Sequence, residues 1–326
     1  MRQAATIKLQ DACEFIVDCL HHTAPIQEEG FPSIRTPNIG KGRLLLDGVN
    51  RVSEETYAIW TQRAVPEAGD LILAREAPAG NVAIIKEGQK VCLGQRTVHL
   101  RPNKKVVDPD FLCYFLLAPI QQGKLLAGET GATAKHVNMA DIRRLELSNL
   151  PDLQLQKKAG ALIAAYDDLI ENNSRRMALL EDSARQLYRE WFVRLHFPGH
   201  EHTPIVDGVP QGWERAPLES ALVLQRGFDL PTQDRQDGNV PIYGSTGILG
   251  YHDKAKAVAP GVVTGRSGTL GEVTYVDEDY WPHNTSLWVK EFKRVTPLFA
   301  LFLLREMDLK QFNGGASVPT LDRKSV

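Results

Sequence analysis

Apolar and polar positions follow the same pattern in two stretches that lie far apart in the chain. Residues 69–85 (GDLILAREAPAGNVAII) and 260–276 (PGVVTGRSGTLGEVTYV) align without gaps at an offset of 191 residues. In each, an apolar run ends at an arginine, Arg75 or Arg266, and a glycine, Gly80 or Gly271, follows five residues later before a second apolar run. The pattern predicts a strand, a tight turn and a second strand, the glycine taking a backbone conformation that strains other residues.

Three further blocks repeat in the same order, with small changes of offset that are typical of loops differing in length. The pairs are residues 95–100 with 284–289, 111–117 (FLCYFLL) with 298–304 (LFALFLL), and 131–138 with 315–322. The first pair predicts a strand with polar residues at its start, and the second a short buried helix. Because all the blocks keep their order, the chain is predicted to contain two copies of one mixed α/β module.

The segment between the copies is predicted to form one long helix, from about Gln154 to Phe192, because no glycine follows Gly160 until Gly199. Its apolar positions alternate at steps of three and four, as in a coiled-coil seam. The seam positions are Ile163, Tyr166, Ile170, Asn173, Met177, Leu180, Ala184, Leu187 and Trp191. Asn173 either fixes the register of the seam at some cost in stability or lies at a tilted surface position.

These patterns predict an α+β chain with two similar mixed α/β modules, residues 1–149 and 198–326, separated by a long coiled-coil-type helix, residues 150–197. A second long helix is expected after the second module, but the sequence reaches Val326 without one. An uncovered seam would expose a long apolar stripe. We therefore expect a second copy, a separate fragment or a partner protein to cover it.

Composition narrows the function. The net charge is −2, with 38 basic and 40 acidic residues, so the overall balance does not indicate a polyanionic partner. The four cysteines lack CxxC spacing and are expected to be buried reduced thiols. No apolar run is long enough to span a membrane and no signal peptide is recognised, so we expect a cytoplasmic protein.

Motif searches reveal no catalytic signature. The chain has no GxSxG, HExxH, Walker or dinucleotide-binding motif, and no carboxylate pair recurs in both copies. His196, His200 and His202 lack partners at a structural-zinc spacing and are expected in a surface linker. We expect neither a metal nor a cofactor on this chain, and expect it not to be an enzyme.

Several segments together resemble the specificity subunit of type I restriction-modification enzymes. They are residues 18–23 (DCLHHT), the two glycine hairpins, residues 150–199 with the Trp191–Phe192 pair, and residues 315–321 (GASVPTL). The resemblance implies that each module is a target recognition domain reading one half of a bipartite double-stranded DNA site. It implies that the helix sets the spacing and docks methyltransferase subunits, which carry S-adenosylmethionine. A restriction subunit using ATP and Mg²⁺ would complete the complex.

Base reading requires side chains that reach groove edges, usually Arg or Lys to guanine and Asn or Gln to adenine. The candidates in both modules are loop residues: Arg35, Lys41, Arg43, Arg75, Gln95, Arg96, Lys135, Arg226, Arg266, Ser267, Asn284 and Thr285. Arg75 and Arg266 occupy equivalent positions, so a shared structural role in the hairpin is as plausible as DNA contact. A function of another class, a coiled-coil scaffold with two protein-binding modules, explains the helix but not the family segments.

Overall fold

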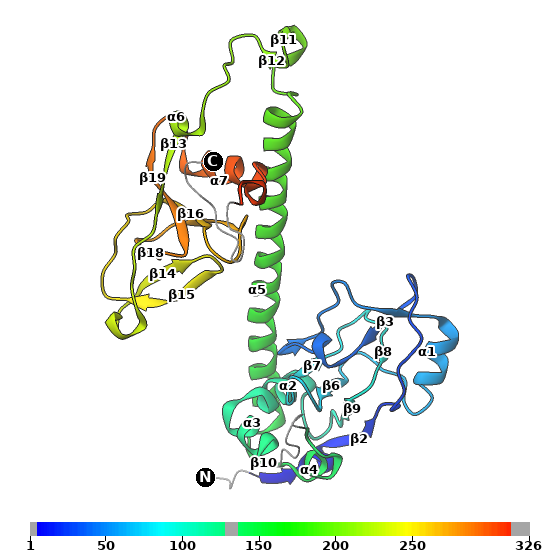
Figure 1. The fold of residues 1–326 in the computed structure, drawn as a ribbon. Helices are drawn as coiled ribbons and strands as arrows, with labels where there is room; N and C mark the ends of the chain where they lie inside the picture. Colours follow the sequence, from blue (N-terminus) through cyan, green and yellow to red (C-terminus); the bar gives the residue numbers. More distant parts are fainter. Residues whose placement is uncertain (1–4, 128–135, 314–326) are drawn as a thin grey trace. The chain divides into compact units, whose positions relative to one another are not determined.

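A computed structural model describes residues 5–127 and 136–313 of the 326-residue chain (Figure 1). The chain divides into two compact units, residues 1–177 and 178–326, and the division falls within its longest helix, α5 (Leu153–Tyr188). Each unit contains one copy of the sequence repeat. Among the described residues, no helix is both long enough and apolar enough to cross a membrane.

The first unit is organised around a five-stranded sheet, which packs on a smaller three-stranded sheet (Figure 1). The order of the large sheet is β2 (Cys13–Asp18), β9 (Thr97–Pro102), β6 (Leu71–Ala74), β7 (Val82–Ile84) and β4 (Gly42–Arg43). The order of the small sheet is β5 (Arg51–Val52), β3 (Phe31–Ile34) and β8 (Cys92–Leu93). A separate pair joins β1 (Ala5–Lys8) to β10 (Glu146–Leu150).

Strand β6 is apolar throughout because both of its faces are buried. Leu71 and Leu73 pack in one core with Leu112 and Leu116 of α2 (Pro109–Leu117), whereas Ile72 and Ala74 pack in another with residues of the small sheet. The Asp108 carboxylate caps α2 by accepting the Phe111 N–H at 3.0 Å. The other helices of this unit are α1 (Glu54–Trp60), α3 (Pro119–Leu126) and α4 (Met139–Arg144).

The second unit repeats this plan with one strand fewer in the large sheet. Its order is β13 (Leu222–Arg226), β19 (Ser286–Phe292), β16 (Gly261–Gly265) and β17 (Val273–Val276). The three-stranded sheet is β15 (Gly247–His252), β14 (Val240–Gly244) and β18 (Trp281–Pro282). Helix α7 (Pro297–Glu306) is capped by Thr296 and covers the large sheet as α2 does in the first unit. The remaining elements are α6 (Leu218–Ala221) and the hairpin of β11 (Ile205–Val206) and β12 (Val209–Pro210).

The strand register confirms the repeat. Leu73 pairs with Val98 in the first unit, and Thr264 pairs with Leu287 in the second, as the offsets of the sequence blocks require. Both glycine hairpins form, with Gly80 at φ +87° and Gly271 at φ +89°. Both short apolar blocks form the predicted helices, α2 and α7. The fourth block lies mostly outside the described residues.

Helix α5 confirms the long central helix, and a π-helical turn, Arg189–Val193, follows it. Within the first unit, one face of α5 packs on α2. Gln156 is buried and accepts the Asp108 N–H at 3.1 Å, and Asp167 accepts the Tyr114 hydroxyl at 2.8 Å. Within the second unit, Tyr188 is buried against Phe299 and Phe302 of α7.

Candidate nucleic-acid interface

The duplicated fold places three chain segments together at equivalent points of the two units. In the first unit, the segment after β2, the end of β3 and the β8–β9 loop meet, because Asp18 pairs with Val98 and Ile34 with Leu93. We call these three segments, together with Asn50, whose carbonyl accepts the Ser33 N–H, the first corner: residues 18–24, 33–35, 50 and 94–96. In the second unit, Arg226 pairs with Leu287 and Tyr243 with Pro282. The second corner comprises residues 226–229, 244–245 and 283–285.

The two corners share equivalent backbone hydrogen bonds. The Gly94 N–H donates to the Ile34 carbonyl at 2.7 Å, and the His283 N–H donates to the Tyr243 carbonyl at 2.8 Å. By this register Gln95 corresponds to Asn284, as in the sequence alignment, and Arg35 corresponds to Gly244. The two corners therefore share a scaffold and differ in the side chains that it presents.

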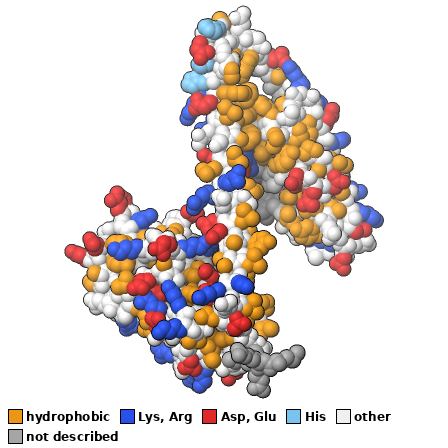
Figure 2. Space-filling view, turned by 180° about the vertical axis from the view of Figure 1, so that it is seen from behind, with side chains coloured by type: hydrophobic (Ala, Val, Ile, Leu, Met, Phe, Trp, Pro, Cys, Tyr) orange, Lys and Arg blue, Asp and Glu red, His pale blue; other side chains and the backbone are white. Residues whose placement is uncertain are grey.

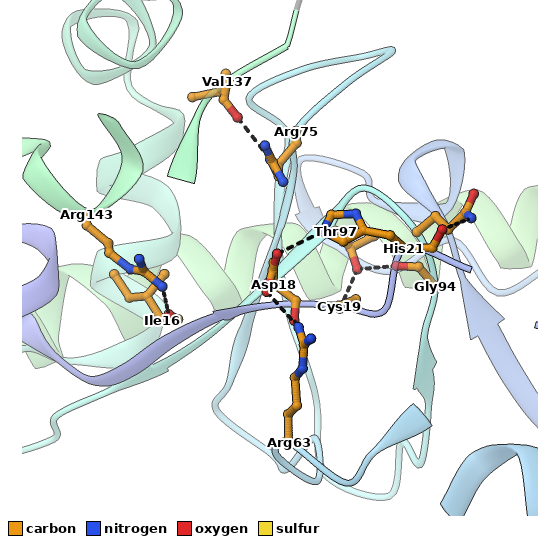
Figure 3. A network of polar contacts seen from close by, with 11 residues as sticks. Ile16, Asp18, Cys19, His21, Arg63, Arg75, Gly94, Thr97, Val137 and Arg143 are labelled. Carbon is orange, nitrogen blue, oxygen red and sulfur yellow. Dashed lines mark hydrogen bonds and ion pairs between the residues drawn. The ribbon is translucent and has the colours of Figure 1, made fainter. Parts of the chain in front are cut away.

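Hydrogen bonds hold the loops of the first corner together (Figure 3). Asp18 accepts from Arg63 at 2.8 Å and lies 3.1 Å from His21 Nε2. The Gln95 amide donates to the His21 carbonyl at 2.6 Å, and Thr97 donates to the Gly94 carbonyl at 2.8 Å. The corner is thus fixed by contacts that leave other polar groups directed to solvent.

Beside these contacts lies an open recess of about 160 Å³. It is lined by Thr23, Ala24, Ile26, Ser33, Arg35, Asn50, Gly94 and Gln95. The lining contains no carboxylate and includes two of the predicted DNA-binding residues, Arg35 and Gln95. Sequence reasoning missed Asn50, which reaches the recess because its carbonyl accepts the Ser33 N–H at 2.7 Å.

The second corner is built on a carboxylate. Asp229 accepts from the Arg226 guanidinium at 3.1 Å and from the Asn284 amide. His283 Nδ1 lies 3.1 Å from the Thr285 hydroxyl, and burial, assisted by the charge of Arg235, lowers the pKa of His283. The structure therefore brings together three predicted residues, Arg226, Asn284 and Thr285, and adds Asp229, which lies in the loop after β13 that differs between the two copies but was not itself predicted.

The two hairpin arginines share a backbone role. The Arg75 N–H donates to the Arg96 carbonyl at 2.9 Å, and the Arg266 N–H donates to the Thr285 carbonyl at the same distance. The Arg75 side chain also donates to the Val137 carbonyl at 3.0 Å (Figure 3). This contact supports the structural alternative for Arg75, without testing DNA contact by either arginine.

The other predicted residues are spread around these corners. Arg96 has φ +65° and pairs with Glu76 at 3.0 Å, and the Ser267 N–H donates to the Thr285 carbonyl at 3.1 Å. Lys41 and Arg43 lie at β4, the opposite edge of the sheet from β2. Lys135 lies outside the described residues.

A buried charged cluster supports the first unit without a counterpart in the second. The Asp70 carboxylate accepts from Arg101 at 2.8 and 2.9 Å, from the Glu67 N–H at 2.9 Å, and lies 2.6 Å from His99 Nε2. Burial raises the pKa of Asp70, but the hydrogen bonds from Arg101 and His99 outweigh it and lower that pKa to about 2. The positions that correspond to Asp70 and His99 are Gly261 and Trp288.

The difference shows that this cluster is specific to the first unit. A side chain at Gly261 would collide with the Tyr280 hydroxyl, since a Cβ there would lie 2.3 Å from it. Nor do the described residues contain a group of three or more His, Cys, Asp or Glu side chains arranged to hold a metal. All four cysteines are free and buried, as predicted, and burial raises the pKa of Cys13 to about 12.

The predicted seam of α5 faces solvent in both units. In the first unit, Ile163, Tyr166, Ile170, Asn173 and Met177 are exposed, and in the second, Leu180, Ala184 and Leu187. Trp191 is half-buried, in an edge contact with Phe192. Figure 2 shows hydrophobic side chains gathered along the helix. Exposed leucines at 155, 162, 169 and 179 widen this stripe.

Comparisons with known proteins agree on one family. Residues 8–182 match the family model described as "Type I restriction modification DNA specificity domain". The type I restriction enzyme MjaIX specificity subunit of Methanocaldococcus jannaschii is 26% identical over 191 residues, which cover 57% of this chain and 43% of that protein. The putative MjaX specificity subunit of the same organism is 29% identical over 220 residues, covering 64% and 50%. The matched region thus spans about half the length of these relatives.

A solved structure shares the fold. The S subunit of a type I restriction-modification system from M. genitalium aligns with a TM-score of 0.63 at 15% identity, covering 98% of this chain and 82% of that one. At this identity the likeness concerns the fold alone, and it agrees with two mixed α/β modules and a long helix between them.

Proposed function

This chain belongs to the type I restriction-modification DNA specificity family, and we propose that it acts as the specificity subunit of such a system. Each module would read one half of a bipartite double-stranded DNA site, and α5 would set the spacing between the halves. The observation that carries the proposal is the pair of corners. One backbone scaffold occurs twice, with Arg35, Gly94 and Gln95 in one copy and Gly244, His283 and Asn284 in the other.

This arrangement suits an asymmetric site. A duplicated scaffold gives both halves the same approach to DNA, and different side chains on it give each half its own sequence. A scaffold that binds two proteins would also use duplicated modules, but it would not need corners that carry hydrogen-bonding side chains such as Arg35, Gln95 and Asn284.

The chemistry is proposed to reside on partner subunits. We propose that methyltransferase subunits, which bind S-adenosylmethionine, dock on the exposed stripe of α5, and that a restriction subunit supplies ATP- and Mg²⁺-dependent activity. The stripe supports docking because apolar surface of this extent is uncommon on soluble monomers. Self-association through the same stripe is the competing outcome.

Charge favours a reader that depends on its partners. The net charge is +1 for residues 1–149 (18 basic, 17 acidic), zero for 150–197 (7 and 7) and −3 for 198–326 (13 and 16). Neutralisation of phosphates supplies much of the affinity for DNA, so the chain alone should bind weakly. Basic surfaces on the methyltransferase subunits would supply the remaining contacts to the DNA phosphates.

Selection from randomised duplex DNA tests the proposal. The chain, assembled with the methyltransferase subunit of its own system, should enrich a motif of two defined blocks separated by an undefined spacer. Enrichment of one continuous block, or of none, would reject the proposal, and capture of proteins without sequence-selective DNA binding would favour the scaffold function.

A further inference from the structure

We propose that the recess of the first corner is a base-reading site, in which Arg35 and Asn50 contact the edges of bases in the first half-site. The inference rests on the proposed function and adds to it a place and a set of side chains. It starts from the recess that Thr23, Ser33, Arg35, Asn50, Gly94 and Gln95 line.

The recess suits a group presented by a large ligand. At about 160 Å³ it is smaller than the sites that enclose small molecules, which hold roughly 300–1,000 Å³. It is open and free of carboxylates, and it is lined by apolar side chains, Ala24 and Ile26, as well as by polar ones. A nucleotide cannot be enclosed there, whereas the exposed edge of a base within a duplex can approach it.

The backbone of Arg35 is held by hydrogen bonds, whereas its guanidinium is unpaired in the part of the chain that the structure describes. Its own N–H donates to Asn38 Oδ1 at 3.1 Å, and its carbonyl accepts the Asn38 N–H at 2.8 Å. The absence of a side chain at Gly94 makes room for its stem, since a Cβ there would lie 3.3 Å from Arg35 Cγ. Among the described residues, no acceptor pairs with its exposed guanidinium. A fixed backbone and an unpaired guanidinium favour bidentate recognition of guanine O6 and N7.

Asn50 and Gln95 add hydrogen-bonding capacity on either side of this guanidinium. The exposed Asn50 side chain has no partner among the described residues, and its backbone is fixed by Ser33. The Gln95 amide nitrogen is held by the His21 carbonyl, and this contact leaves its oxygen, within the described part of the chain, as an acceptor. Amide side chains pair with adenine N6 and N7, so the recess can discriminate bases as well as bind them.

The second unit explains why the site is specific to one half of the DNA. Gly244 replaces Arg35, and His283 replaces Gly94, so neither the guanidinium nor the space for its stem is present. In their place Arg226, Asp229 and Asn284 form a different polar group. Two modules that read different sequences should differ at the reading positions, and here they do.

Selection from a randomised duplex library, with the chain assembled with its methyltransferase subunit, tests the site. Arg35→Ala should lower discrimination at one position of the first half-site by roughly tenfold to a hundredfold, with the second half-site and the spacer unchanged. Arg35→Lys should fail similarly, because an ammonium keeps the charge but loses the bidentate fork. Asn50→Ala should relax a neighbouring position. Arg144→Ala, at an exposed arginine of α4, is the matched control.

The outcomes separate the two proposals. If Arg35→Ala weakens binding to all sequences equally, the residue contacts phosphate and the assignment is overturned. If Arg35→Lys keeps full discrimination, bidentate recognition by the guanidinium is refuted. The assignment is also overturned if Arg144→Ala relaxes the same position. If the wild-type complex selects a bipartite motif and neither variant changes it, only this assignment fails. If the wild-type complex selects no motif, the proposed function fails with it.

Discussion

Replacing Asp70 by Asn should destabilise the first unit in a manner that depends on pH. Asp70 and His99 are only 4% and 2% exposed at their side chains, and Arg101 is 23% exposed. Asn keeps the shape of the carboxylate but removes the charge that both hydrogen-bonded partners face. Breaking a buried ion pair costs about 3–5 kcal/mol, and the partial exposure of Arg101 places the expected loss near about 3 kcal/mol at pH 7.

The pH dependence follows from the lowered pKa. Hydrogen bonds bring the pKa of Asp70 from 3.8 to about 2, which corresponds to about 2 kcal/mol of stability. Because the folded-state pKa is the lower one, this contribution is complete above about pH 4 and is lost as the pH falls towards 2. The free energy of unfolding of the variant should therefore be lower than that of the wild type at pH 7, and the difference should shrink between pH 4 and pH 2.

Urea unfolding, followed separately at pH 7, 4 and 2.5, measures both effects. Asp110→Asn is the matched control, because burial, with the neighbouring charge of Asp108, raises the pKa of Asp110. Its replacement should leave stability at pH 7 unchanged or slightly higher. A loss below about 1 kcal/mol for Asp70→Asn, or equal losses at every pH, would refute the electrostatic explanation.

Three further predictions concern α5 and DNA affinity. Gly160→Ala should destabilise the packing of α5 on α2 by about 1–3 kcal/mol in thermal unfolding, because a Cβ would lie 2.6 Å from Phe111 N. The control Gly123→Ala places its Cβ within 4 Å of nothing and should be neutral or stabilising by up to about 1 kcal/mol. The double variant Ile170→Glu, Met177→Glu should have a stability within about 0.5 kcal/mol of the wild type, but it should no longer co-purify with the methyltransferase subunit. A change in the oligomeric state of the chain alone would instead indicate self-association. In filter binding, the isolated chain should have a lower affinity for duplex DNA than the complex, and this affinity should depend only weakly on salt. Nanomolar affinity of the isolated chain in physiological salt would contradict this prediction.

Sequence reasoning recovered the elements that depend on local pattern. The apolar runs flanking Gly80 and Gly271 predicted two hairpins, and the uninterrupted seam predicted α5. Both predictions depend only on nearby residues, because the spacing of apolar positions and the residues of a turn are local features of the sequence. The internal repeat added long-range information, since two copies of one pattern must share a topology.

The candidate interface was only partly predictable. Arg35 and Gln95 were proposed separately, and only the parallel pairing of β3 with β8 places them around one recess with Asn50. Asp70, His99 and Arg101 were not identified, because a charged cluster formed by an ordinary turn residue and two strand residues has no sequence signature. Which polar side chain supports a loop and which remains free, as for Arg75 and Arg35, depends on partners far away in the sequence.

Methylation mapping in cells would show whether this chain reads a bipartite DNA site whose spacing depends on α5. Genomic DNA from cells that carry this chain with its methyltransferase subunit, and a version with four residues inserted after Asn173, would be compared base by base. If α5 sets the spacing, the wild type should methylate one asymmetric bipartite motif. The insertion should keep the same half-sites with a spacer longer by about two base pairs, because four helical residues add about 6 Å and each base pair about 3.4 Å. Altered half-sites with an unchanged spacer, or methylation at a single continuous motif, would contradict it.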